Sequence, residues 1–89
     1  MGINDKTSLL VVTKHESGAL FDLLEPFKDN DINMLQLARH PIPGVKWEYL
    51  FFIDIEGHQD NENVKNAISK IKSKVSKLEI LGSYPIAVL

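Results

Sequence analysis

Hydrophobic residues gather in four runs whose spacing is typical of β-strands. Residues 7–13 are apolar at both odd and even positions, as expected of a strand in the middle of a sheet. Residues 32–39 and 47–56 predict two further strands, and the second of these is rich in aromatic and β-branched side chains. A shorter run, 78–84, predicts a fourth strand, and Pro85 limits its continuation as a central strand. The pattern therefore predicts one small sheet.

Between the first two runs the apolar positions change to the spacing of an amphipathic helix. This helix is expected to begin after Ser17 as its N-cap, and its apolar face comprises Ala19, Leu20, Leu23, Leu24 and Phe27. Pro26 predicts a kink or an early end, because proline lacks the backbone donor that a helix interior uses. The sequence Asp-Asn-Asp at 29–31 tolerates left-handed backbone and is expected to end the helix.

A second helix is expected after Gly57. Residues 60–62 supply an N-cap and an acidic first turn, and the apolar face comprises Val64, Ala67, Ile68, Ile71 and Val75. Pro43 and Gly44 suit the central positions of a type II turn and predict an antiparallel hairpin. The order βαββαβ, with right-handed crossovers, predicts a ferredoxin-like α+β sandwich. Its four-stranded antiparallel sheet would have 7–13 and 47–56 as central strands and both helices on one face.

The composition narrows the class of protein. The 89 residues allow one domain, expected at 7–89 after a polar lead-in at 1–6 that is disordered or artificial. The absence of cysteine excludes disulfides, thiolate metal sites and cysteine nucleophiles, and it favours the reducing cytoplasm. A net charge of -2 disfavours nucleic acid as a partner. The apolar runs are far shorter than the roughly 20 residues that cross a membrane, so no membrane partner is expected.

Few residues suggest catalysis. His15, His40 and His58 lie far apart, and none has a partner at metal-ligand spacing, so we expect no metal site and no cofactor. The serines lack the sequence context of a catalytic nucleophile. Asp54 and Glu56 have a spacing that suits acid–base chemistry, but a solvated sheet face is the commoner reason for that pattern. We therefore expect no catalytic residues.

The aromatic residues of the third strand invite comparison with RNA-binding sheets, in which exposed aromatic side chains stack on bases. The neighbouring charges here are acidic rather than basic, which argues against that function. We expect Trp47, Tyr49 and Phe51 to pack in the core instead.

Residues 14–20, Lys-His-Glu-Ser-Gly-Ala-Leu, connect the first strand to the first helix. Gly18 would let the backbone approach a ligand closely, and the free N–H groups of the first helical turn suit a carboxylate. A simply capped helix start is the alternative, and physical reasoning alone favours it.

Four segments of the chain form a distinctive combination. They are Lys-His-Glu-Ser-Gly-Ala-Leu at 14–20, Asp-Ile-Asn at 31–33, Trp-Glu-Tyr-Leu-Phe-Phe-Ile-Asp-Ile-Glu-Gly-His at 47–58 and Leu-Gly-Ser-Tyr-Pro at 81–85. Together they resemble the C-terminal ACT domain of prephenate dehydratase, over residues 7–86. The resemblance implies a regulatory module without activity of its own. It would follow a catalytic dehydratase domain, which often has a chorismate mutase domain ahead of it.

The resemblance also implies a ligand site. In the family, L-phenylalanine binds between two such domains through a Gly-Ala-Leu motif, matched at 18–20, and a Glu-Ser-Arg-Pro motif. The second motif corresponds to 38–41, Ala-Arg-His-Pro, so only its proline matches. Either the site is retained with rearranged polar contacts, or it has lost affinity or changed its ligand. The implied site comprises Glu16, Ser17, Gly18, Ala19, Leu20, Asn33, Met34, Leu37, Ala38, Arg39, His40 and Pro41.

A homodimer follows from the same resemblance. Edge strands or helices of two copies would meet, and the first turn of the first helix of one copy would face the second strand of the other. Binding of L-phenylalanine would favour one arrangement and so inhibit the attached enzyme. The alternative is a structural dimerisation module that has lost or changed its ligand.

Overall fold

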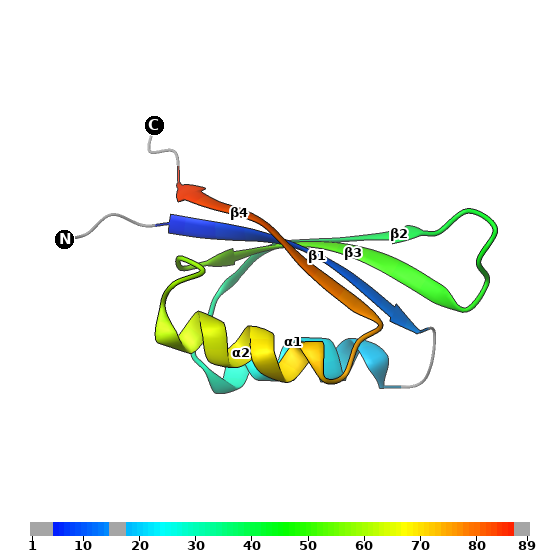
Figure 1. The fold of residues 1–89 in the computed structure, drawn as a ribbon, viewed down its shortest axis with the longest axis horizontal. Helices are drawn as coiled ribbons and strands as arrows, with labels where there is room; N and C mark the ends of the chain where they lie inside the picture. The colour runs from blue at the N-terminus through cyan, green and yellow to red at the C-terminus, as the bar shows by residue number, and fades with distance from the viewer. Residues whose placement is uncertain (1–4, 15–17, 87–89) are drawn as a thin grey trace.

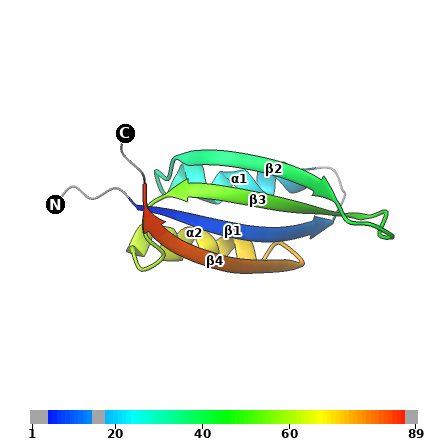
Figure 2. The same ribbon diagram turned by 90° about the horizontal axis from the view of Figure 1, so that it is seen from above.

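The structure, a computed structural model, describes residues 5–14 and 18–86. Its elements, in order, are β1 (Asp5–Lys14), α1 (Ala19–Asp29), β2 (Met34–Pro41), β3 (Glu48–Glu56), α2 (Glu62–Lys72) and β4 (Lys77–Pro85). The strands form one antiparallel sheet in the order β2-β3-β1-β4. Both helices lie against one face of this sheet (Figures 1 and 2). The predicted ferredoxin-like fold, with β1 and β3 at its centre, is confirmed.

The core lies between the sheet and the helices, which explains the alternation within the strands. Leu9 and Val11 of β1 stand in register with Ile53 and Phe51 of β3, and all four are buried. Phe52 lies on the other face of the sheet and is 39% exposed. The helices complete the core with Leu23, Phe27, Val64, Ala67, Ile68 and Ile71.

The start of α1 differs from the prediction. Gly18, rather than Ser17, is the N-cap, with φ 82° in the left-handed region and no side-chain capping bond. Ser17 lies outside the described residues. Only glycine adopts this backbone conformation without steric cost, so Gly18 sets the direction in which the chain enters the helix.

The end of α1 was predicted correctly. The helix continues through the buried Pro26 and ends at Asp29, where Asn30 Nδ2 donates to the Pro26 carbonyl at 2.8 Å and Asp31 has φ 55°. An early end at Pro26 is wrong: the helix continues for three more residues, although proline supplies no intrahelical donor at that position.

Several element boundaries lie a few residues from their predicted positions. β1 begins at Asp5, so Lys6 belongs to the strand, where its ammonium lies 3.7 Å from the Asp54 carboxylate. β2 begins at Met34, because Ile32 is still part of the turn after α1 and packs in the core. α2 ends at Lys72, although Val75 continues to pack against the core as expected.

The connection between β2 and β3 explains an error in the predicted core. The Val45 N–H donates to the Ile42 carbonyl at 3.1 Å and Gly44 has φ 79°, which fits the predicted type II turn. This connection projects beyond the helix layer (Figures 1 and 2). Trp47 is therefore 71% exposed rather than buried, whereas Phe51 is buried and Tyr49 packs against the core.

Candidate functional site

Among the cavities beside α1, two lie on the side of β2 and at opposite ends of the helix. The cavity at its start has a volume of about 280 Å³ and is lined by Thr13, Lys14, Gly18, Ala19, Leu20, Phe21, Arg39, Tyr49 and Phe51. The cavity at its end has a volume of about 500 Å³ and is lined by Leu24, Phe27, Lys28, Asp31, Ile32, Asn33 and Met34. We call them the start cavity and the end cavity.

The start cavity offers hydrogen-bond donors for an anion. The Asp22 N–H bonds to the Gly18 carbonyl at 2.9 Å, so the N–H groups of the three residues before Asp22 precede the first intrahelical bond. Gly18 has no side chain to cap them. The positive end of the helix dipole adds to the attraction for a carboxylate.

Arg39 brings a permanent positive charge to the same cavity. Its register partner is Phe51, so it lies on the helix-covered face of β2, and its guanidinium carbon is 4.9 Å from the centre of the Tyr49 ring. Stacking on an aromatic ring restricts the guanidinium and leaves its edge N–H groups available as donors. The start cavity is therefore a cationic, partly aromatic pocket.

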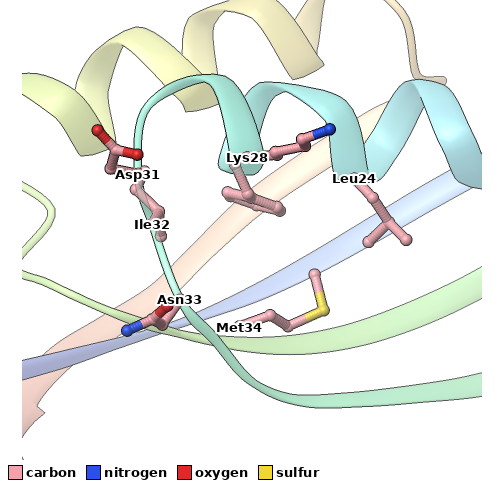
Figure 3. A pocket seen from close by; sticks show the side chains of 7 residues that line it. Leu24, Lys28, Asp31, Ile32, Asn33 and Met34 are labelled. Carbon is pink, nitrogen blue, oxygen red and sulfur yellow. The ribbon is translucent and has the colours of Figure 1, made fainter.

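The end cavity combines apolar walls with acceptor groups. Figure 3 shows Leu24 pointing from α1 toward the sheet and Met34 pointing from β2 toward the helix. Asn33 Nδ2 donates to Glu56 Oε1 at 2.9 Å, which leaves the side-chain oxygen of Asn33 as an acceptor. The exposed carboxylate of Asp31 and the side chain of Lys28 also line the end cavity, so it offers acceptor groups and one cation beside apolar walls.

The site residues predicted from the sequence do not lie together in one cavity of the structure. Gly18, Ala19, Leu20 and Arg39 line the start cavity, whereas Asn33 and Met34 line the end cavity. The remaining described ones do not line either cavity: Leu37 lies on the helix-covered face of β2, Ala38 and His40 lie on the opposite face, and Pro41 ends the strand. Glu16 and Ser17 lie outside the described residues.

Sequence reasoning missed several lining residues. Tyr49 and Phe51 were assigned only to the core, and Leu24 only to the apolar face of a helix, yet each also borders a cavity. Their position follows from the pairing of β2 with β3 and from the helix lying above this pair. For Asp31 the sequence did carry a signal, because its place after the helix predicted left-handed backbone, which the structure has. That signal did not indicate that Asp31 lies beside a cavity.

Asp54 and Glu56, whose spacing suits acid–base chemistry, both accept hydrogen bonds from other side chains. Asp54 Oδ1 accepts a hydrogen bond of 2.6 Å from the Ser8 hydroxyl, and Glu56 accepts the bond from Asn33. These contacts agree with the interpretation of a polar sheet face.

At 5–14 and 18–86, there is no group of three or more histidine, cysteine, aspartate or glutamate side chains placed to hold a metal ion. Within the same ranges, neither helix has the length and hydropathy needed to span a membrane.

Comparisons with known proteins identify relatives of the chain, although no family model matches it. The bifunctional chorismate mutase/prephenate dehydratase of Aquifex aeolicus (strain VF5) is 43% identical over 86 residues, which make up 97% of this chain and 24% of that protein. The solved prephenate dehydratase from Arthrobacter aurescens in complex with L-Phe has a TM-score of 0.80 and 26% identity, over 96% of this chain and 30% of that one. A quorum-quenching acylase, GqqA, has a TM-score of 0.91 and 28% identity, over 97% and 31% of the two chains.

The fold, with the start and end cavities, defines a small ferredoxin-like α+β domain that has room for a ligand on the side of β2. The sequence matches are more specific. The chain is homologous to the C-terminal part of bifunctional chorismate mutase/prephenate dehydratases, and the resemblance to prephenate dehydratase is confirmed. It spans about a quarter of the length of the curated relatives it matches.

Proposed function

We propose that this chain is the regulatory domain of a prephenate dehydratase and that it binds L-phenylalanine between two copies. The observation that carries the proposal is the start cavity, which joins Gly18, Ala19 and Leu20 to the cationic Arg39. The similar Arthrobacter aurescens structure, which contains L-Phe, supports the same ligand class. Catalysis by the parent enzyme would lie in residues outside this chain.

The free edge of β2 favours a dimer. β2 is an outer strand of the sheet, and it exposes Leu35 and Leu37 by 46% and 38%. A two-fold axis normal to the sheet would pair β2 with its copy in antiparallel fashion and would place the two α1 helices side by side in opposite directions. The start cavity of one copy would then adjoin the end cavity of the other.

The two cavities complement each other as a site for a zwitterionic amino acid. The N–H groups of Ala19 and Leu20, together with Arg39, would bind the carboxylate. Asp31 and Asn33 of the other copy would accept hydrogen bonds from the ammonium group. The phenyl ring would lie among the apolar residues of both cavities, such as Leu20 of one copy and Met34 of the other.

Regulation follows if the ligand prefers one dimer arrangement. Because each site would join two copies, L-phenylalanine would stabilise the arrangement in which both cavities are closed against each other. Coupling of this kind is typically about 1–3 kcal/mol, which is enough to lower the activity of attached catalytic domains several-fold. Equal binding to both arrangements would produce no inhibition. The cysteine-free composition fits the cytoplasm, where we place the enzyme.

One observation supports a second candidate function, a structural dimerisation module that has lost or changed its ligand. Ala38 and His40 occupy the first and third positions of the altered motif, yet they lie on the face of β2 away from the start cavity. Arg39 alone of these three can reach a ligand there.

Calorimetric titration of L-phenylalanine into the purified domain, with D-phenylalanine as the control ligand, separates the two functions. We expect saturable binding of the L-enantiomer alone. Arg39→Met should weaken it about 10- to 150-fold, the equivalent of one charge-assisted hydrogen bond. Lys46→Met makes the same chemical change on the exposed β2–β3 connection and should leave the affinity unchanged. Absence of binding by both enantiomers would favour the dimerisation module, and unaltered binding by Arg39→Met would contradict the placement of the carboxylate.

A further inference from the structure

The face of the sheet opposite the helices has an apolar centre that no described element covers (Figure 2). Leu10 and Val12 of β1 stand in register with Phe52 and Leu50 of β3, and all four point to this open face. Phe52 is 39% exposed, and the other three are half-buried by their neighbours. The cavities beside α1 lie on the other side of the sheet, so this surface is separate from the candidate ligand site.

Opposite charges stand side by side at both ends of the apolar centre. The register pairs Lys6 with Glu56 at one end and Lys14 with Glu48 at the other. At each end the lysine belongs to β1 and the glutamate to β3. The open face therefore carries a positive strand next to a negative strand, with hydrophobic residues midway along both.

This charge pattern distinguishes the two ways in which two copies could pack their open faces with aligned strands. A two-fold axis perpendicular to the strands would bring Glu48 opposite Glu56 and Lys14 opposite Lys6, which would put like charges together four times. An axis parallel to the strands would lay β1 of each copy over β3 of the other. Each lysine would then face a glutamate, and the apolar residues would meet in the middle.

We propose that a second copy of this chain docks on the open face, with the two-fold axis parallel to the strands and running between β1 and β3. Packed sheets lie about 10 Å apart, with their strands within about 30° of each other. Lysine and glutamate side chains at the ends of the strands can meet across this gap. Leu10 and Val12 would pack on Phe52 and Leu50 of the other copy. This contact leaves the β2 edge free, and it meets the proposed ligand site only at Glu56, which accepts a hydrogen bond from Asn33.

Several polar groups beside the centre are already paired within one chain. The Ser8 hydroxyl bonds to Asp54 and to the Tyr84 hydroxyl, and Lys77 lies 3.3 Å from Glu79. The net charge of these groups is small because Lys6 lies beside Asp54. Burial of the face would therefore add apolar contacts and the four terminal ion pairs without leaving an unpaired charge among them.

Sedimentation velocity over a dilution series tests the proposal with two double variants. Glu48→Lys with Glu56→Lys makes both strands positive, and Lys6→Glu with Lys14→Glu makes both negative. Each variant alone should associate at least about tenfold more weakly than the wild-type chain, so that its largest species has half the mass at a matched concentration. An equimolar mixture should recover the wild-type mass, because every lysine of one variant then faces a glutamate of the other.

A control separates this pairing from attraction between net charges. Lys65→Glu with Lys70→Glu makes the same charge change on the exposed side of α2 and should associate like the wild-type chain. Urea unfolding of each variant verifies that the monomers remain folded. The proposal is overturned if the wild-type chain does not associate, or if these charge reversals do not weaken its association. It is equally overturned if the mixture of the two face variants does not recover the wild-type mass.

Discussion

Gly57, which follows β3, provides the sharpest test of the local geometry. Its φ of 123° lies in a region that side-chain-bearing residues rarely adopt. A Cβ at this position would lie 3.0 Å from Cγ2 of Val64, which is fully buried on α2. The backbone cannot shift freely, because the Gly57 N–H donates to the Asp5 carbonyl at 2.7 Å and its carbonyl accepts from Thr7 Oγ1 at 2.6 Å.

Gly57→Ala therefore carries two costs. Placing a non-glycine residue in this backbone region costs about 1–3 kcal/mol, and crowding a packed core costs about 1–3 kcal/mol more. Taking a value of about 3 kcal/mol for the sum, and about 4–8 °C per kcal/mol for a domain of this size, the melting temperature should fall by about 12–24 °C. Circular dichroism during urea and thermal unfolding measures both quantities.

A matched glycine isolates the steric part of this cost. Gly44 has φ 79°, but a Cβ there would meet nothing within 4 Å, so Gly44→Ala should cost only about 1–2 kcal/mol from the backbone. The difference between the two variants measures the contact with Val64. In a Val64→Ala background, Gly57→Ala should cost less than in the wild-type chain. Equal costs for Gly57→Ala and Gly44→Ala would refute the reasoning.

Three further predictions concern the faces of β3, its preceding loop and the ligand. Phe51→Ala should lower the free energy of unfolding by about 3–5 kcal/mol, and Phe52→Ala by only about 1 kcal/mol; equal losses in urea titrations would contradict the assigned faces. Trp47→Ser should change the same quantity by less than about 0.5 kcal/mol, and a drop of several degrees in thermal unfolding would mean that the indole packs against the core. L-phenylalanine at one hundred times its Kd should stabilise the domain by about 2.7 kcal/mol. D-phenylalanine should not, and an equal rise in melting temperature with both enantiomers would argue against a stereospecific site.

The fold could be predicted from the sequence because each element carries its own pattern. The two most apolar runs became the central strands, and helical spacing identified the buried faces of both helices. Trp47 was misplaced because its spacing from Tyr49 and Phe51 matches the core face. Periodicity indicates which face a side chain takes but not how far the helix layer extends to cover it.

The candidate site was harder to predict because its residues depend on the register of β2. Met34 and Leu37 stand opposite Ile55 and Ile53, so both are on the helix-covered face although they are three residues apart. An irregularity between Met34 and Gln36 changes the alternation there. Beyond it the ordinary alternation resumes, so Arg39 points to the start cavity while Ala38 and His40 lie on the opposite face. A simple count of odd and even positions along this strand would have placed Met34 on the opposite face from Leu37 and Arg39.

The placement of the start and end cavities at opposite ends of α1 has a genetic consequence. Two chains paired at their β2 edges would build two sites, each from the start cavity of one chain and the end cavity of the other. A chain altered at Arg39 and a chain altered at Met34 would each form dimers with no intact site. A mixed dimer of the two would contain one intact site and one doubly damaged site. Under the proposed regulation by L-phenylalanine, two alleles altered at these positions should complement each other partially when expressed together, restoring half of the sites in every mixed dimer.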